Sequence, residues 1–255
     1  MLIGIDIGNT DFTIGIFQGS KLLDTFRMRS KSKKTSDEYG MFMLDVIKYR
    51  GYSVEDVEDV IIASVVPNVM HSFTSAIIKY LDLRPIIVGP GIKTGIKIMT
   101  NNPKETGADR IVDAVAAYEI YKRPVIVIDF GTATTYDVIN EKGEFIGGVI
   151  TPGLGTAVKM LGQQAAKLPE IEIRKPNHII GKDTVSAMQA GCVYGYIGQT
   201  EYIIRKLKEE SGYKDAFVVA TGGLGRMISE ETNTIDEYDQ YLTLKGLQII
   251  YEKQK

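Results

Sequence analysis

The sequence predicts an α/β protein built from two similar lobes, and two observations lead to this prediction. Short apolar runs bounded by glycine, aspartate and asparagine alternate with longer segments of helical periodicity. The pattern strand, Asp-x-Gly, small polar residue, strand also occurs twice, at residues 6–10 and 129–133, about half of the 255-residue chain apart. We call these segments the first turn and the second turn. They place one lobe at residues 1–120 and the other at residues 121–255.

The first lobe is expected to open with three antiparallel strands. Apolar or alternating runs separated by turn residues are typical of such a meander, and they occur here at residues 2–5, 12–17 and 21–28. Thr-Ser-Asp-Glu at residues 35–38 then begins an amphipathic helix that ends near residue 50, with Ser36 or Asp37 as the candidate N-cap. A strand, a helix that starts with proline and a further strand come next, at residues 60–65, 67–80 and 85–88.

The second lobe repeats this theme of strands and helices. Its apolar runs predict strands at residues 125–128, 134–139, 145–150 and 217–220. Helical periodicity predicts helices, the first of which closes the first lobe, at residues 111–121, 152–166, 184–210 and 241–251. Residues 167–182 contain two prolines and are predicted to form a loop, with or without a short strand.

Composition excludes several classes of protein. Lys and Arg total 30 against 32 Asp and Glu, whereas nucleic-acid-binding proteins usually carry a concentrated basic excess. The one basic run, residues 27–34, is predicted to be a solvated loop. Cys192 is the only cysteine, so no intrachain disulfide and no cysteine-based metal site are expected. Since no apolar stretch approaches the ~20 residues of a membrane span and no signal peptide is evident, we expect a cytoplasmic protein without a membrane or nucleic-acid partner.

Each Asp-x-Gly turn has the features of a phosphate-binding loop. Gly8 lets a phosphate oxygen approach without a Cβ in the way, and the turn amides can form an anion-binding concavity. Further donors are the side chains of Asn9, Thr10 and Thr13. Asp6 is placed at the strand end to hold Mg²⁺ directly or through water. One such turn favours a plain hairpin, but its twin at residues 129–135 favours two hairpins that bind a nucleoside triphosphate from both sides of a cleft.

Other phosphate-binding motifs are missing from the sequence. It contains no GxxxxGK[ST] and no GxGxxG after a strand. Residues 221–225, Thr-Gly-Gly-Leu-Gly, come after a predicted strand and precede a helix. Gly222 and Gly223 would let this turn lie flat against an adenosine, and an ordinary strand-to-helix connection explains the same pattern equally well.

Three further segments have both a functional and a structural interpretation. Asp109, in Gly-Ala-Asp-Arg at residues 107–110, is either the cap of the following helix or a general base for an alcohol. In the functional interpretation Arg110 binds an anionic group, because its guanidinium is bidentate toward carboxylates. The glycines of residues 147–153 imply a close backbone approach, to a ligand or to a neighbouring helix. Thr184 is a candidate N-cap or a substrate contact.

Taken in order along the chain, these segments resemble the type III pantothenate kinase family. The matching motifs are at residues 6–10, 107–110, 129–135, 147–153, 181–191, 221–223 and 242–247. Each motif is weak alone, but together they span essentially the whole chain in the family's order. The resemblance implies two ribonuclease-H-like lobes of the actin-like ATPase class with a nucleotide cleft between them. It also implies phosphorylation of pantothenate by ATP, the first step of coenzyme A biosynthesis.

The resemblance also implies roles for individual residues. ATP and its Mg²⁺ would be bound by Asp6, Gly8, Asn9, Thr10, Thr13, Thr132, Gly222 and Gly223. Asp109 would accept the proton of the substrate hydroxyl, and the pantothenate pocket would be lined by Gly107, Ala108, Asp109 and Arg110. Asp129 would coordinate the monovalent cation, K⁺ or NH₄⁺, that the family requires. Thr184 would contact pantothenate from the partner subunit of a homodimer.

One position departs from the family pattern. Many members have a tyrosine shortly before the Asn-Pro that precedes the Gly-Ala-Asp-Arg segment, and this tyrosine lines the pantothenate pocket. Here Thr100 occupies the corresponding position. One alternative is therefore a kinase of another small hydroxylated acid or sugar. A second alternative is a nucleotide-dependent regulatory module, since similar folds serve as nucleotide-driven switches.

Overall fold

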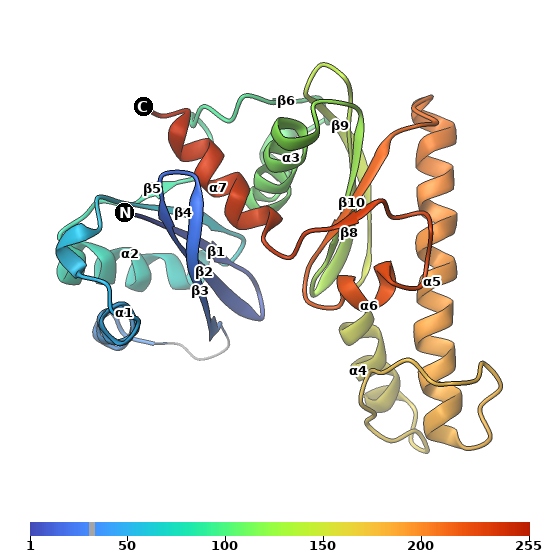
Figure 1. Cartoon of the computed structure of the whole chain (residues 1–255). Coiled ribbons are helices and arrows are strands. Elements are labelled where there is room, and N and C mark those ends of the chain that lie inside the picture. Colours follow the sequence, from blue (N-terminus) through green and yellow to red (C-terminus); the bar gives the residue numbers. More distant parts are fainter. Residues whose placement is uncertain (31–33) are drawn as a thin grey trace. The chain divides into compact units, whose positions relative to one another are not determined.

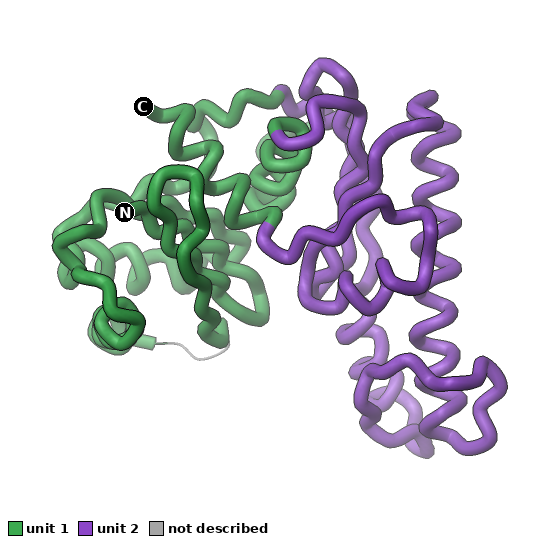
Figure 2. The backbone as a smooth tube through the Cα atoms, in the orientation of Figure 1, with its two compact units in different colours: residues 1–96, 101–119, 242–255 green, residues 97–100, 120–241 purple. Residues whose placement is uncertain are grey.

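The computed structural model describes residues 1–30 and 34–255, which form two compact units (Figures 1 and 2). Unit 1 consists of Met1–Ile96, Asn101–Glu119 and Leu242–Lys255. Unit 2 consists of Lys97–Thr100 and Ile120–Tyr241. The centre of the basic run that was predicted to be a solvated loop, residues 31–33, lies outside the described residues.

Unit 1 is built on a five-stranded sheet of order β3-β2-β1-β4-β5. Its strands are β1 (Leu2–Ile7), β2 (Asp11–Gln18), β3 (Lys21–Arg29), β4 (Asp59–Ser64) and β5 (Ile86–Ile87). The first three form the predicted antiparallel meander. β4 and β5 run parallel to β1, because a crossover connection separates each of them from the strand it pairs with.

Two helices, α1 (Ser36–Tyr49) and α2 (Pro67–Leu81), cover one face of this sheet (Figure 1). The predicted caps of α1, Ser36 and Asp37, are wrong, because Thr35 is the N-cap. The Thr35 hydroxyl accepts the Glu38 N–H at 3.3 Å, and the Glu38 carboxylate accepts the Thr35 N–H at 2.8 Å. This reciprocal pair satisfies two amides that a helix start leaves without partners.

The opposite face of the same sheet is covered by α7 (Leu242–Glu252), and α3 (Ala108–Tyr121) lies beside α7, as Figure 1 shows. Gly4 of β1 lies against Leu247 of α7, and Gly15 of β2 lies against Leu244. A Cβ at Gly246 would collide with the Val112 carbonyl of α3, so the two helices also meet closely.

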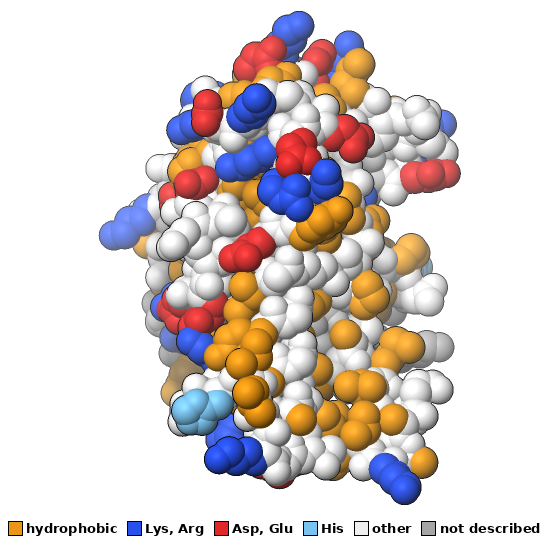
Figure 3. Space-filling model, turned by 90° about the vertical axis from the view of Figure 1, so that its right-hand side faces the viewer, with side chains coloured by type: hydrophobic (Ala, Val, Ile, Leu, Met, Phe, Trp, Pro, Cys, Tyr) orange, Lys and Arg blue, Asp and Glu red, His pale blue; other side chains and the backbone are white. Residues whose placement is uncertain are grey.

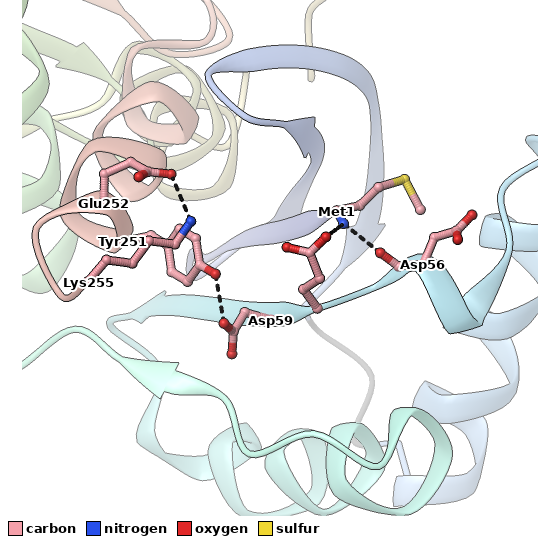
Figure 4. A network of polar contacts seen from close by, with 7 residues as sticks. Met1, Asp56, Asp59, Tyr251, Glu252 and Lys255 are labelled. Carbon is pink, nitrogen blue, oxygen red and sulfur yellow. Dashed lines mark hydrogen bonds and ion pairs between the residues drawn. The ribbon is translucent and has the colours of Figure 1, made fainter.

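The last helix therefore belongs to unit 1, although the sequence placed residues 121–255 in one lobe. The reason is the fit of its leucines into the glycine-lined face of β1 and β2, which no local pattern reveals. Its end is fixed as well, since the Tyr251 hydroxyl donates to the Asp59 carboxylate at 2.7 Å (Figure 4). Beside it, the Met1 ammonium group donates to the Asp56 carbonyl at 2.5 Å.

Unit 2 contains a six-stranded sheet of order β11-β10-β7-β8-β9-β6. Its strands are β6 (Lys97–Ile98), β7 (Val125–Phe130), β8 (Ala133–Ile139), β9 (Glu144–Pro152), β10 (Phe217–Thr221) and β11 (Glu237–Tyr238). Apart from β6, the order and directions of its strands match those of unit 1, with β7 in the place of β1. The two similar lobes predicted from the sequence repeat are thereby confirmed.

The helices of unit 2 are α4 (Leu154–Gln164), α5 (Thr184–Ser211) and the short α6 (Gly225–Ser229). α5 packs on the sheet through Val193, Tyr196 and Ile197, which belong to the apolar core of this unit. Residues 167–182, all of them described, contain no helix or strand, as predicted. Within the described parts of the chain, every helix is too short or too polar to cross a membrane.

Candidate functional site

The first turn joins β1 to β2 at the carboxyl end of β1. Asp6 is half-buried and lies opposite Thr13 across the hairpin, so the two side chains are neighbours on one face. The Gly8 N–H donates to the Asp11 carbonyl at 3.1 Å and closes the turn. Asn9 and Thr10 are exposed at its tip. The structure thus groups the residues that were predicted to bind ATP in this unit.

Ser30, which the sequence analysis did not single out, holds this turn. Its N–H donates to the Thr10 carbonyl at 2.8 Å, and its hydroxyl donates to the Gly8 carbonyl at 2.6 Å. Ser30 comes directly after β3 and reaches the turn only because β3 pairs with β2 in the observed register. No local pattern in the sequence carries that information.

The second turn joins β7 to β8 in the same way. Asp129 is half-buried and lies opposite Thr135 on one side and Thr221 on the other. Thr132 is exposed, and its carbonyl accepts two hydrogen bonds, from the Gly153 N–H at 3.0 Å and from the Thr156 hydroxyl at 2.7 Å.

Gly153, the last glycine of residues 147–153, lies against the backbone of the second turn. A Cβ on Gly153 would collide with the Gly131 carbonyl and lie 2.6 Å from the Thr132 carbonyl oxygen. Only glycine therefore lets the junction between β9 and α4 lie directly on the second turn. The close approach is to the turn's own backbone.

Gly222 lies against Asp129, a pairing that the sequence did not predict. Its φ of +89° is in the region that favours glycine, and a Cβ there would lie 2.5 Å from Asp129 Oδ1 and 2.6 Å from the Phe130 nitrogen. The Tyr238 hydroxyl donates to the Gly222 carbonyl at 2.9 Å. Gly223 has open space where a Cβ would be. The segment proposed to lie against adenosine is thus fixed beside the Asp129 carboxylate.

Asp109 lies inside the first turn of α3, so its interpretation as the cap of this helix is wrong. The Gly107 carbonyl accepts the first helical hydrogen bond, from the Ile111 N–H at 3.1 Å, which makes Gly107 the capping position. The Asp109 carboxylate folds back over Gly107, where a Cβ would collide with Oδ1. Oδ1 also accepts the Arg110 N–H at 2.8 Å.

Burial raises the pKa of the Asp109 carboxyl above its ordinary value, and the backbone N–H and charge of Arg110 act in the opposite direction. The segment lies at the carboxyl edge of the unit 1 sheet. A Cβ on Gly107 would be 3.5 Å from Val65 Cγ1, and the Val65 N–H donates to the Ile7 carbonyl at 3.2 Å. Asp109 and the first turn are therefore placed at the same edge of one sheet.

Thr100 and Thr184 both belong to unit 2. Thr100 comes after β6 in unit 2, whereas Gly107, Ala108 and Arg110 belong to unit 1. Thr184 is the exposed first residue of α5, and Asp183 is the N-cap, since its carboxylate accepts the Ser186 N–H at 2.8 Å. The capping interpretation of Thr184 is thus wrong.

The start of α5 is distant from the second turn of the same chain. Tyr196, twelve residues after Thr184, donates its hydroxyl to the Pro152 carbonyl at 2.8 Å, beside the second turn. At a rise of 1.5 Å per residue, Thr184 is about 18 Å further along the helix axis. Figure 1 shows the start of α5 beside the far end of α4 and the loop after it.

Each turn has a single aspartate beside it as a candidate metal ligand, Asp6 in unit 1 and Asp129 in unit 2. Within residues 1–30 and 34–255, no three His, Cys, Asp or Glu side chains gather as a metal site. Asp6 and Asp129 each stand beside a glycine turn at a strand end. Taken within its own unit, each carboxylate fits the support of an Mg²⁺ ion that takes most of its oxygen ligands from phosphate and water.

Two units of equal strand order, each with an Asp-x-Gly turn at its first strand, define the class of the protein, the actin-like ATPase and sugar kinase fold. The activator of the 2-hydroxyisocaproyl-CoA dehydratase from Clostridium difficile, solved with bound ADPNP, has this fold. It matches with a TM-score of 0.52 and 13% identity over 99% of this chain and 96% of that chain. A Campylobacter jejuni protein described as a Baf family transcriptional activator matches with a TM-score of 0.63 and 18% identity over 99% and 98%.

Sequence comparison then gives the family. The family model of type III pantothenate kinase matches residues 2–206. A type III pantothenate kinase of Agathobacter rectalis is 58% identical over 254 residues, which cover 100% of this chain and 98% of that protein. The chain belongs to the type III pantothenate kinase family, and it is therefore a kinase.

Proposed function

We propose that the chain transfers the γ-phosphoryl group of ATP to the primary hydroxyl of pantothenate, giving 4′-phosphopantothenate and ADP as the first step of coenzyme A biosynthesis. The observation that carries the proposal is the partly buried Asp109 at the carboxyl edge of the unit 1 sheet, in a chain of this family. A cytoplasmic location is in keeping with the biosynthetic role.

Asp109 acts in this proposal as the general base. Its carboxylate accepts the proton of the hydroxyl while that oxygen bonds to the γ-phosphorus, and the bond from this phosphorus to the bridging oxygen of ADP breaks. A carboxylate whose pKa is raised by burial is a better base near neutral pH than an exposed one. The Arg110 N–H fixes the orientation of the carboxylate.

The two turns supply the phosphate-binding groups. Their exposed tips present amides and side chains that suit phosphate oxygens, and the residues assigned to ATP are Asp6, Gly8, Asn9, Thr10, Thr13 and Thr132. Gly222 and Gly223 are assigned to the adenosine. Mg²⁺ bound to the phosphates, with Asp6 in support, supplies positive charge that neutralises the transferring group.

Substrate binding is assigned to the segment that carries the base. Arg110 suits the carboxylate of pantothenate because its planar guanidinium can donate two parallel hydrogen bonds. Gly107 and Ala108 add little side-chain bulk beside it.

Asp129 is assigned to a monovalent cation, K⁺ or NH₄⁺. A carboxylate near a triphosphate is repelled unless a cation lies between them. For two unit charges 4 Å apart at an effective dielectric constant of 20, this repulsion is about 4 kcal/mol. The Gly222 backbone, which touches Asp129, restricts the space in which such a cation would be held.

A homodimer in which Thr184 acts on the partner's substrate would account for its distance from the second turn. α5 has an exposed face with glycines at helical spacing, Gly191, Gly195 and Gly198, each with open space where a Cβ would be. Glycine destabilises a helix interior by about 1 kcal/mol relative to alanine, so a closely approaching second backbone would explain these residues. Figure 3 views the side on which α5 lies, and hydrophobic side chains gather over its lower part.

The reaction is tested by measuring ADP release with Mg-ATP and K⁺, with and without pantothenate, and by identifying the product by mass. We expect release that depends on pantothenate and a product heavier by one phosphoryl group. Binding of ATP without turnover of pantothenate would contradict the proposed substrate and leave the fold assignment intact.

The dimer proposal has a sharper test in mixed subunits. Asp109→Asn and Thr184→Ala subunits are each expected to be weakly active alone. If Thr184 serves the partner's site, a mixed dimer contains one complete site and regains activity. If Thr184 acts within its own chain, or if the protein is a monomer by light scattering, mixing restores nothing.

A second candidate substrate class rests on Thr100. Without a ring at this position, the pocket would have more room and less apolar surface, which suits another small hydroxylated acid or sugar. Comparing such acceptors with pantothenate by kcat/KM distinguishes the two. Thr100→Tyr is expected to lower the KM for pantothenate, and an unchanged KM would remove this residue from the pocket.

A further inference from the structure

In both turns, backbone carbonyls accept hydrogen bonds from one backbone N–H and one side-chain hydroxyl that lie outside the turn. At the first turn both groups come from Ser30, which binds the Thr10 and Gly8 carbonyls. At the second turn the N–H comes from Gly153 and the hydroxyl from Thr156, and both bind the Thr132 carbonyl.

Strand register shows that the backbone parts of the two devices are equivalent. In unit 1, Asp11 of β2 pairs with Arg29 of β3, so the next residues outward are Thr10 and Ser30. In unit 2, Ala133 of β8 pairs with Pro152 of β9, so the next residues outward are Thr132 and Gly153. The residue directly after β3 in unit 1, and directly after β9 in unit 2, thus donates its N–H to the last carbonyl of the turn.

The side-chain parts differ, and each adapts to its unit. In unit 1 the residue after the third strand is a serine, whose hydroxyl reaches a second carbonyl at Gly8. In unit 2 the equivalent residue has to be glycine because a Cβ would collide with the turn, and the hydroxyl comes from Thr156, three residues later in α4. The two hydroxyls therefore bind different carbonyls of their turns, that of Gly8 in unit 1 and that of Thr132, which also accepts the Gly153 N–H, in unit 2.

Peptide planarity makes these bonds relevant to phosphate binding. In a trans peptide the carbonyl of one residue and the N–H of the next point in opposite directions. A Gly8 carbonyl held by Ser30 directs the N–H of exposed Asn9 away from Ser30. A Thr132 carbonyl held by Thr156 does the same for the N–H of exposed Ala133.

The first turn needs such restraint most, because Gly8 can adopt conformations that other residues avoid. Ser30 is only 8% exposed, so a Gly8 carbonyl that lost the Ser30 hydroxyl would have little water to replace it. Rotation of the Gly8–Asn9 peptide would then relieve the unpaired carbonyl, and it would turn the Asn9 N–H away from its present direction.

We propose that Ser30 and Thr156 are positioning residues for ATP, which act by fixing the turn peptides so that their amides face the phosphates. The inference rests on the proposed function for the identity of the ligand. Neither residue is assigned to the nucleotide itself, and each acts through a backbone carbonyl.

The test uses the full-length protein with Ser30→Ala and Thr156→Val, which remove each hydroxyl with little change of volume. We expect the Kd and KM for Mg-ATP to rise about 3- to 10-fold, the range of one neutral hydrogen bond. The KM for pantothenate should stay unchanged. Ser30→Thr and Thr156→Ser, which keep a hydroxyl, should restore the affinity for Mg-ATP.

Ser211→Ala is the matched control, because the Ser211 hydroxyl donates to the Leu207 carbonyl at 2.6 Å, at the end of α5. It loses this bond and a longer one from the Tyr213 N–H at 3.4 Å, and it should leave both KM values unchanged. If the two turn variants only lower Tm as this control does, with Kd for Mg-ATP unchanged, the inference is wrong.

Failure of this inference can be distinguished from failure of the proposed function and from misfolding of a variant. If wild-type protein binds Mg-ATP and does not phosphorylate pantothenate, the proposed substrate is wrong and the Kd measurement still decides the role of Ser30. If Ser30→Ala does not fold, Thr156→Val decides alone, because Thr156 lies half-exposed at the start of α4.

Discussion

The two turns differ in the residues that follow the partner of their aspartate, which is Ala63 of β4 in unit 1 and Thr221 of β10 in unit 2. In unit 2, Gly222 comes directly after β10 and its backbone lies on the Asp129 carboxylate. In unit 1 the residues after Ala63 of β4 are Ser64 and Val65, and a Cβ at Gly107 would touch Val65. One scaffold therefore carries two different environments next to its aspartate.

The equivalence of these positions is a consequence of register. Asp6 pairs with Ala63 across β1 and β4, and Asp129 pairs with Thr221 across β7 and β10. In unit 2 the space beside the aspartate is filled by the chain's own backbone. In unit 1 the start of α3 lies at this edge of the sheet, and with it a partly buried carboxylate. The comparison teaches that the repeat specifies the turns, whereas the segments that lie beside the turns, Gly222 in unit 2 and the start of α3 in unit 1, differ between the units.

The largest expected effect tests the special role of unit 1. Asp109→Asn should lower kcat about 10²- to 10⁴-fold, the usual contribution of a general base, while Mg-ATP binding and the circular dichroism spectrum stay unchanged. The control is Glu105→Gln, which removes an exposed carboxylate that accepts the Asn102 amide at 2.7 Å near the same segment. Near-normal turnover by Asp109→Asn would mean that this carboxylate only stabilises the start of α3.

The next effect compares Gly222, which follows Thr221 of β10, with Ser64, which follows Ala63 in β4. Gly222→Ala should lower the free energy of unfolding by about 2–4 kcal/mol, because it combines a left-handed backbone with overpacking. Ser64→Ala removes one hydroxyl that accepts the Val66 N–H at 3.1 Å, and it should cost about 1 kcal/mol. Denaturant unfolding of both variants checks this, and equal losses would show that the two positions are not as different as the contacts indicate.

A third prediction distinguishes the roles proposed for Asp129 and Asp6 by the dependence of activity on K⁺. Wild-type protein should lose most of its activity when Na⁺ replaces K⁺, if Asp129 holds the monovalent cation. Asp129→Asn should have low activity that no longer depends on the choice of cation, because the charge that binds it is gone. Asp6→Asn should also be weakly active but keep the dependence on K⁺. Loss of that dependence in Asp6→Asn alone would exchange the two assignments.

The smallest expected effect is on how the free energy of unfolding depends on pH. Burial raises the pKa of Asp109, so the folded protein holds this proton more strongly than the unfolded chain. The folded state therefore loses stability as pH rises from the unfolded pKa through the raised folded pKa. Asp109→Asn lacks this loss, and it should gain stability relative to wild type as the pH rises through that window. Thermal unfolding of both proteins from acid to neutral pH checks the sign, and a constant difference would contradict it.

Most of the fold was predictable because its signals are local. Alternating and apolar runs gave the strands of the two meanders, and the Asp-x-Gly repeat gave the relation between the units. Two of the three wrong helix caps, those of α1 and α5, have a different reason. At Thr35 and Asp183 the sequence offers several adjacent residues that can cap a helix, and only the hydrogen bonds to Glu38 and Ser186 distinguish between them.

The candidate site was predictable only in part. The sequence named Asp6, Asp109 and Asp129 because each stands in a short motif with a strand or helix next to it. It could not show that Gly222 touches Asp129, since 93 residues separate them and their contact depends on the pairing of β10 with β7. Ser30 and Thr156 were missed for the same reason, because each reaches its turn through the register of a third strand.

By itself, the sequence determined the type and order of the elements, the two turns and the family, because periodicity, turn residues and motifs are written within a few neighbouring residues. The tertiary structure alone decided that the last helix packs in unit 1 and that Asp109 is partly buried over Gly107. It also decided that a side-chain hydroxyl donates a hydrogen bond to a backbone carbonyl of each turn. These features depend on burial and on strand register, which are set only when distant segments share one sheet or one core.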